Sequence, residues 1–176
     1  MSKYRLVGLE TVKIGTTNTT TFAMPTTFTT VTNLVPGTAI LAIEMPSKTK
    51  YFVEDHDYAD MVITEDGAKT IEFATRDMVL SNFVLGMGGS VSSSVWSAST
   101  TPRGVVEKAI ELTSKTYIGV QHTFEIARAE FSGGAELRFS NKGATEPGVL
   151  TFAAEVLMGY NTSDSVYVSP MVITRS

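Results

Sequence analysis

Alternation of large apolar residues with small or polar ones is the feature that most constrains how this chain can fold. The clearest run is Val149–Leu157, whose apolar members are Leu150, Phe152, Ala154 and Val156. Neighbouring side chains of a strand point to opposite faces, so this pattern predicts a strand with one buried face. The same alternation recurs at Lys69–Ala74, Glu107–Thr113, Tyr117–Phe131 and Ala135–Ser140. We therefore expect a mainly β chain of antiparallel sheets, each with one face in water.

Carboxylates recur on the polar side of these runs. The residues concerned are Glu72, Glu111, Glu125, Glu136 and Glu155. Two interpretations stay open, because ordinary solvent exposure and a shared acidic surface both place glutamates opposite a buried face. Arg138 falls on the same side as Glu136, where it would neutralise that position.

One segment has helical rather than strand spacing. In Arg76–Leu85, an apolar stripe recurs at intervals of three and four and continues to Met87. The stripe consists of Val79, Leu80, Phe83 and Val84. Thr75 is the expected N-cap and Gly86 the expected C-cap. We expect this helix to flank the sheets and to pack its stripe on one of them.

Two polar segments interrupt the pattern. Ten of the seventeen residues in 16–32 are Thr, which favours extended backbone and suggests an N-terminal arm or a plain surface loop. The apolar run at Thr38–Met45 is consistent with a buried strand. Residues 47–68 are polar and form a long hairpin excursion between it and the strand at Lys69–Ala74. Asp66-Gly67 marks its return. A last strand is expected at Val166–Thr174, and Pro170 places it at a sheet edge.

Nothing in the sequence indicates catalysis. The chain has no cysteine, which excludes disulfides and thiolate metal sites. Asp55-His56-Asp57 resembles a metal cluster, but adjacent residues on extended backbone point apart. Gly86, Gly88 and Gly89 follow a helix, so they do not form a phosphate-binding loop. We expect no enzyme activity, no metal and no cofactor.

The charge content narrows the possible partners. Only 18% of residues are charged, which suggests that some surface is buried in an assembly. The net charge is −4 and the basic residues are scattered, so specific binding of a DNA duplex is not expected. The first residues lack a signal-peptide core, and no apolar run is long enough to span a membrane. We expect a protein made in the cytoplasm with no membrane partner.

Taken in order, these parts resemble the phage tail tube (major tail) protein family. The segments that carry the resemblance are VKIG, PGTAILAIE, IEFATRDMVLSNFVLGMGG and FEIARAEFSGG…GVLTFAAEVL. The resemblance covers most of the chain and implies a single domain over residues 1–176. It also implies a β-sandwich-like or barrel-like subunit with one flanking helix.

The resemblance further implies that copies form rings, usually hexameric, which stack into the hollow tail tube of a virion assembled in the host cytoplasm. The five glutamates would line the lumen, through which DNA passes without specific binding. The tip at Asp55, His56, Asp57 and Tyr58 would contact the next ring, and other tail proteins would bind the tube. Contractile, non-contractile and secretion-system relatives are not separated by this sequence.

A binding module is the alternative class. A β-sandwich on a phage fibre or baseplate would present clustered aromatic side chains for a carbohydrate or protein ligand. Here Tyr51, Tyr58, Trp96 and Tyr160 are dispersed along the chain, which counts against this class.

Overall fold

The computed structural model describes residues 7–51, 61–65, 67–98, 106–131, 136–138 and 148–176. The first part of this chain forms β1 (Val7–Thr16), β2 (Phe28–Val31), β3 (Ile40–Ile43), β4 (Ser47–Tyr51), β5 (Met61–Glu65), β6 (Lys69–Thr75), α1 (Leu80–Met87), β7 (Ser90–Ser92) and β8 (Val95–Ser97). The second part forms β9 (Val106–Lys115), β10 (His122–Phe131), β11 (Glu136–Arg138), β12 (Val149–Val156), β13 (Gly159–Asn161), β14 (Val166–Val168) and β15 (Val172–Arg175).

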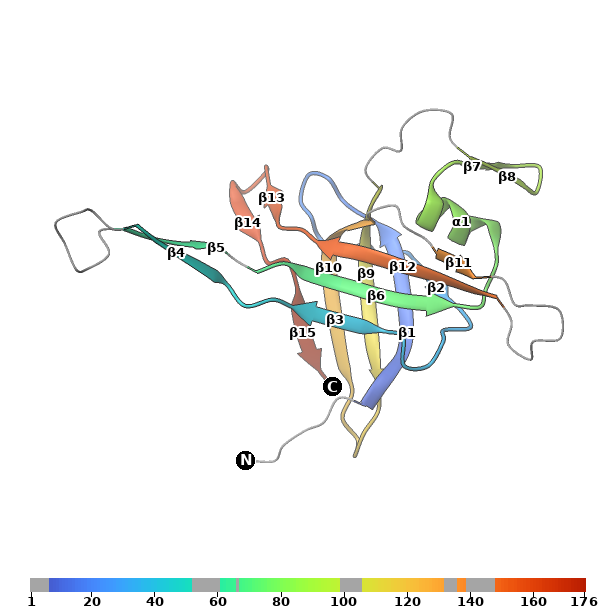
Figure 1. Cartoon of the computed structure of the whole chain (residues 1–176), viewed down its shortest axis with the longest axis horizontal. Coiled ribbons are helices and arrows are strands. Elements are labelled where there is room, and N and C mark those ends of the chain that lie inside the picture. The colour runs from blue at the N-terminus through green and yellow to red at the C-terminus, as the bar shows by residue number, and fades with distance from the viewer. Residues whose placement is uncertain (1–6, 52–60, 66, 99–105, 132–135, 139–147) are drawn as a thin grey trace.

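One nine-stranded antiparallel sheet forms the body of the molecule (Figure 1). Its strand order is β2-β1-β9-β10-β12-β6-β3, with β11 attached to β12 and β15 attached to β10. The pairs β4–β5, β7–β8 and β13–β14 form separate two-stranded hairpins. The predicted mainly β, antiparallel architecture with one short helix is confirmed.

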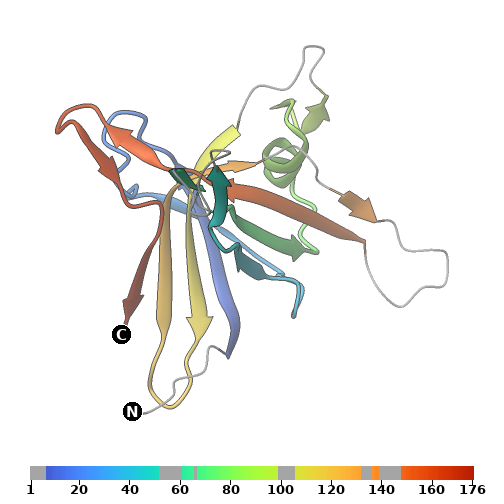
Figure 2. The same cartoon turned by 60° about the vertical axis from the view of Figure 1, so that its left-hand side comes forward.

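The sheet bends sharply at β10. The first residues of β10 pair with β15, whereas Ala129–Phe131 pair with β12. A register shift between Ile126 and Ala129 marks a bulge, which bends and twists a strand. As a result, β1, β9, β10 and β15 lie along one axis, whereas β12, β6 and β3 lie across that axis (Figure 2).

A backbone connection closes the bent sheet into a barrel-like shape. Leu34, which follows β2, forms an isolated bridge with Thr75 at the end of β6. The Val35 amide donates to the Ala74 carbonyl at 2.9 Å. Thr75 is fully buried, and its hydroxyl donates to the Thr32 carbonyl at 2.6 Å. The segment that follows β2 is thus joined to the end of β6.

The core lies between the two halves of the bent sheet. Every large apolar residue that the alternation assigned to a buried face is buried wherever the structure describes it. These are Ile71, Phe73, Ile110, Leu112, Phe124, Ile126, Leu150, Phe152 and Val156. The rings of Phe73 and Phe152 are 5.0 Å apart, and Phe131 meets Phe152 edge-on at 6.4 Å.

The helix begins later than the sequence predicts. It spans Leu80–Met87, its N-cap is Val79 without a side-chain cap, and its C-cap is Gly88 rather than Gly86. Thr75 does not cap it, because Thr75 still belongs to β6 and its hydroxyl closes the barrel. The positive φ of 73° at Gly88 suits the glycine there.

The Thr-rich segment 16–32 contains a strand that was not expected, because it ends in β2, which pairs with β1. Within segment 47–68, β4 and β5 pair as a hairpin, as expected. The Gly-rich connection after the helix contains the β7–β8 hairpin, where the Trp96 indole donates to the Gly88 carbonyl at 2.8 Å. The single strand expected at Val166–Thr174 is two strands on different partners, β14 and β15. Within the described residues, no helix is long and apolar enough to cross a membrane.

Candidate assembly surfaces

Four of the predicted carboxylates lie on the sheet face turned away from the core. Glu72, Glu111, Glu125 and Glu155 each alternate with buried neighbours, such as Ile71 and Phe73 around Glu72. Glu72 and Glu155 are exposed, and Glu111 and Glu125 are half-buried. Glu136 belongs to β11 and pairs with Thr151, but its side chain lies outside the described residues.

Strand pairing brings these carboxylates together and adds two more. Glu125 lies opposite Glu111, and Glu130 lies opposite both Glu107 and Glu155. Sequence reasoning missed Glu130, because strict alternation from Phe124 would place it on the core face. The bulge after Ile126 reverses that phase. The sequence does contain a signal of the bulge, because Phe131 does not fit the alternation of Phe124 and Ile126.

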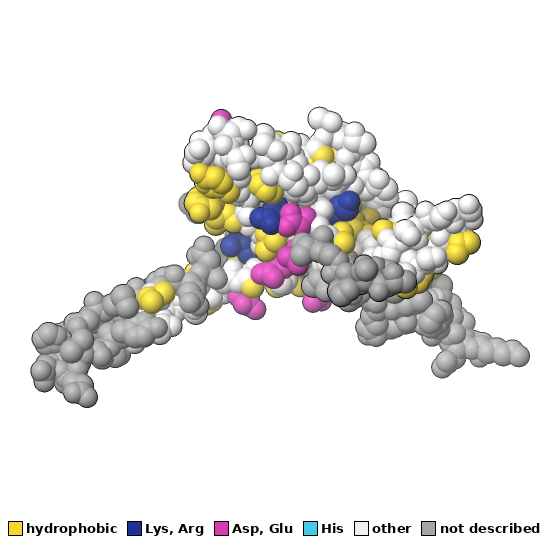
Figure 3. All heavy atoms as spheres, turned by 90° about the horizontal axis from the view of Figure 1, so that it is seen from above, with side chains coloured by type: hydrophobic (Ala, Val, Ile, Leu, Met, Phe, Trp, Pro, Cys, Tyr) yellow, Lys and Arg dark blue, Asp and Glu magenta, His cyan; other side chains and the backbone are white. Residues whose placement is uncertain are grey.

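Two basic side chains interrupt the acidic face. Lys13 of β1 contacts Glu111 at 2.6 Å, and Arg128 of β10 contacts Glu107 at 2.5 Å. The Glu107 carboxylate accepts a hydrogen bond from the Arg128 guanidinium and so raises the pKa of Arg128 above its usual range. In Figure 3, acidic and basic side chains lie next to one another. The face is therefore mixed in charge, with the carboxylates in excess.

The remaining carboxylates stay available to solvent or to a ligand. Within the described part of the chain, Glu72, Glu125 and Glu155 make no ion pair. Their negative potential is therefore not cancelled by a contacting cation. An anionic polymer near this face would be repelled at low ionic strength and less so as salt rises.

Four strands of the main sheet, β2, β3, β11 and β15, leave one edge unpaired among the described strands. β3 pairs only with β6, and β15 pairs only with β10. Apolar side chains are exposed on both, including Ile40 and Ile43 on β3 and Val172 and Ile173 on β15. The prediction of a buried strand at Thr38–Met45 is therefore wrong, because β3 lies at a sheet edge. An exposed edge with free backbone groups and apolar side chains is a template for pairing with another strand.

The β4–β5 hairpin projects far from the sheet (Figure 1). Its described side chains are exposed, among them Lys48, Lys50 and Ile63. An isolated two-stranded hairpin is marginally stable in water, which indicates that it gains contacts elsewhere. The predicted tip residues Asp55, His56, Asp57 and Tyr58 lie outside the described residues.

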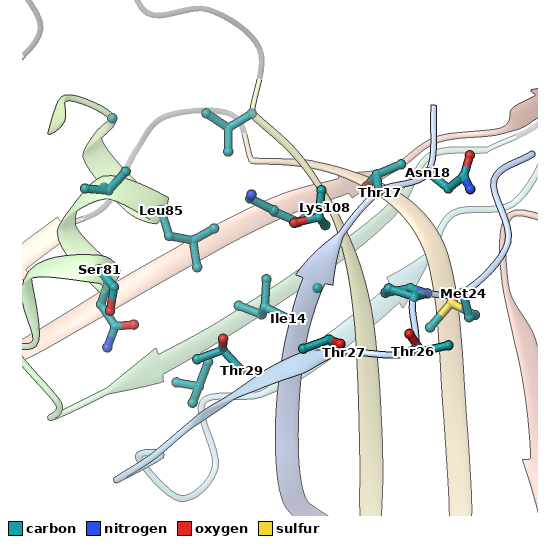
Figure 4. A pocket seen from close by; sticks show the side chains of 18 of the residues that line it. Ile14, Thr17, Asn18, Met24, Thr26, Thr27, Thr29, Ser81, Leu85 and Lys108 are labelled. Carbon is teal, nitrogen blue, oxygen red and sulfur yellow. The ribbon is translucent and has the colours of Figure 1, made fainter. Parts of the chain in front are cut away.

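A cleft of about 1320 Å³ separates the Thr-rich segment from α1 (Figure 4). Ile14, Thr27 and Thr29 line one wall, Ser81 and Leu85 line the other, and Lys108 reaches in from β9. Thr17 also lines it, and the buried Thr17 hydroxyl has no hydrogen-bond partner among the described residues.

The predicted helix stripe is only partly correct. Val79 is 46% exposed at the N-cap and does not pack on the sheet. Leu80, Phe83 and Val84 are half-buried, and Phe83 lies 6.1 Å from Trp96 between ring centroids. Among the described side chains of the helix, Leu85 is the one that joins the core.

The described residues include no group of three or more His, Asp or Glu side chains placed to hold a metal ion. Neither a model of a known protein family nor a curated protein matches the chain in sequence.

Proposed function

We propose that the chain is a structural subunit that assembles with copies of itself into stacked rings, forming the hollow tail tube of a bacteriophage or a related particle. The observation that carries this proposal is the pair of unpaired, apolar strand edges at β3 and β15. A protein that worked as a monomer would expose both edges to aggregation.

Ring formation would remove these edges. If β3 of one copy pairs with β15 of its neighbour, each copy uses two different surfaces, so the contact is head-to-tail. Such contacts close into a ring when the rotation between copies allows it. Six copies per ring follow the resemblance to tail tube proteins. In the ring, one sheet would run through all copies, and the edges of β3 and β15 would both be paired.

The charged face supports a role as a conduit. In a closed ring, the face opposite the core would line the channel, where Glu72, Glu125 and Glu155 would repel phosphate. DNA would pass without specific binding, and other tail proteins would contact the ends of the tube. The protein would then reside in the virion tail after assembly in the host cytoplasm.

Assembly of the purified protein tests the proposal directly. We expect rings or tubes by negative-stain electron microscopy and large species by sedimentation. Ile40→Lys with Ile43→Lys should abolish assembly, because charges on an edge strand prevent strand pairing. Ser163→Lys, in an exposed turn, is the matched control and should assemble normally. A wild-type protein that stays monomeric at high concentration would exclude the tube.

A second function has one observation in its favour. Tyr160 of β13 and Tyr167 of β14 meet at 5.1 Å between ring centroids, and Tyr167 is 73% exposed. Sequence reasoning treated the aromatic residues as dispersed, and folding places these two together. A paired aromatic surface on a hairpin suits a carbohydrate or protein ligand of a binding module. A monomeric protein that loses glycan binding on Tyr167→Ala would favour this alternative.

A further inference from the structure

We propose that the tip of the β9–β10 hairpin of one copy inserts into the cleft beside α1 of the next copy along the tube axis. This contact rests on the proposed function, because it joins one ring to the next. The tip is Tyr117–Val120, and the cleft is the one between the Thr-rich segment and α1.

The tip is both strained and apolar. Tyr117 and Val120 exchange backbone hydrogen bonds of 2.9 and 3.0 Å, which leaves Ile118 and Gly119 as the two turn residues. Both have positive φ, 50° at Ile118 and 72° at Gly119. A β-branched residue rarely adopts this conformation, and such two-residue turns favour Asn-Gly.

Ile118 is also 80% exposed, so neither local conformation nor burial within the subunit favours it. Tyr117 beside it is 41% exposed. Strained residues that persist at an exposed position point to a function outside the isolated fold. An apolar contact with another molecule would provide the stabilisation that the free subunit lacks.

The cleft has the complementary character. Apolar side chains line it, including Ile14, Val31, Val84 and Val106. One of its polar groups, the Thr17 hydroxyl, is buried without a hydrogen-bond partner among the described residues.

Tip and cleft lie at opposite ends of one strand. Val106 and Lys108, at the start of β9, line the cleft, whereas the tip follows the end of β9 at Lys115. Ten residues of strand span roughly 33 Å. Figure 1 shows the β9–β10 turn and α1 at opposite ends of the molecule. A shift along the strand therefore brings the tip of one copy to the cleft of the next, a contact that repeats without limit.

Charge supports the same pairing. Lys108 is the one charged side chain among the described residues that line the cleft. Beside the tip, the Glu10 carboxylate accepts a hydrogen bond from the Gln121 amide at 2.8 Å. The negative charge of Glu10 would attract Lys108 of the next copy. Lys115 is exposed at the same end, and its positive charge would oppose this attraction. Glu10→Lys should therefore weaken stacking, and Lys115→Glu should strengthen it.

Disulfide trapping tests the contact, and the absence of native cysteine makes single-cysteine variants unambiguous. Ile118→Cys is mixed with Thr29→Cys, which sits on the cleft wall, and the mixture is oxidised during assembly. Ser163→Cys replaces Thr29→Cys as the matched control. We expect the amount of mixed dimer with Thr29→Cys to be at least about tenfold higher than with the control. A mass tag on one variant distinguishes mixed dimers from homodimers.

The outcomes separate the two proposals. Tubes with the mixed disulfide support both, and tubes without it overturn the tip–cleft contact alone. Mixed disulfides without tubes support the contact and overturn the tube. The absence of both tubes and mixed disulfides would overturn both proposals.

A second variant removes the apolar tip without endangering the fold. Ile118→Asn relieves the strained turn, so the melting temperature of the subunit should rise while tube formation is lost. Tubes of normal length from Ile118→Asn would overturn the contact.

Discussion

At the scale of single residues, Phe152 joins the two halves of the core. Its ring meets those of Phe73 and Phe131, and it is 1% exposed. Phe152→Ala should lower the free energy of unfolding by about 3–5 kcal/mol, because it removes a buried ring and leaves a cavity. Phe83→Ala is the control; since Phe83 is half-buried, we expect a loss below about 2 kcal/mol. Chemical denaturation measures both, and equal losses would contradict a core centred between the sheet halves.

Arg128 connects several separate parts of the fold. Its guanidinium donates to Glu107 and, at 3.1 Å, to the Met158 carbonyl, and it lies 5.3 Å from the centre of the Phe22 ring. It thereby joins the Thr-rich loop and the start of the β13–β14 hairpin to the sheet.

Arg128→Met keeps much of the side-chain volume but removes these hydrogen bonds. We expect a loss of about 1–3 kcal/mol in stability, because the Met158 carbonyl and Glu107 lose their donor. Hydrogen exchange at the Thr162 amide, which donates to the Thr20 carbonyl at 3.1 Å, should become faster. A double-mutant cycle with Glu107→Gln measures the coupling. Unchanged protection at Thr162 would show that Arg128 does not hold the loop.

At the scale of elements, none of the described side chains of the β4–β5 hairpin belongs to the core. Ser47 pairs with Glu65 at its base, so Lys48–Thr64 can be replaced by Asn-Gly without disturbing the strands on either side. We expect a subunit with an unchanged melting temperature that no longer forms tubes, because the hairpin would contact the next ring.

Circular dichroism and electron microscopy of the shortened protein check the two parts separately. Replacing Thr49 by Ser within the intact hairpin is the control. Tubes of normal length from the shortened protein would remove the hairpin from the stacking contact.

At the scale of the whole molecule, the acidic face should keep DNA from adhering to the assembled tube. Glu125→Lys with Glu155→Lys should leave folding and assembly intact but make tubes bind DNA. The binding should fall steeply between about 50 mM and about 200 mM salt, because phosphate contacts release counterions. Co-sedimentation of DNA with tubes measures it, and Thr19→Lys with Ser163→Lys is the control for added charge. Equal binding by both pairs would show that the face is ordinary solvated surface.

The sequence predicted the buried faces well and the ends of elements less well. Alternation identified Ile71, Phe73, Leu150 and Phe152 as core because period-two patterning is a property of each strand alone. The helix start was misplaced because Thr75 has the side chain of an N-cap, yet closes the barrel instead. Among the candidate assembly surfaces, the acidic face was predictable, whereas the cleft and the strained tip were not.

By itself, the sequence determined the mainly β class, the faces of most strands and the presence of one helix. Only the tertiary structure decided the strand order, the bulge in β10 and the closure through Leu34 and Thr75. It also decided that Lys13 meets Glu111 across 98 positions of the chain. The physical reason is that side-chain alternation is local, whereas strand pairing depends on distant partners. One alternating strand could pair with many neighbours in many registers, and only the packing of the whole core fixes one arrangement.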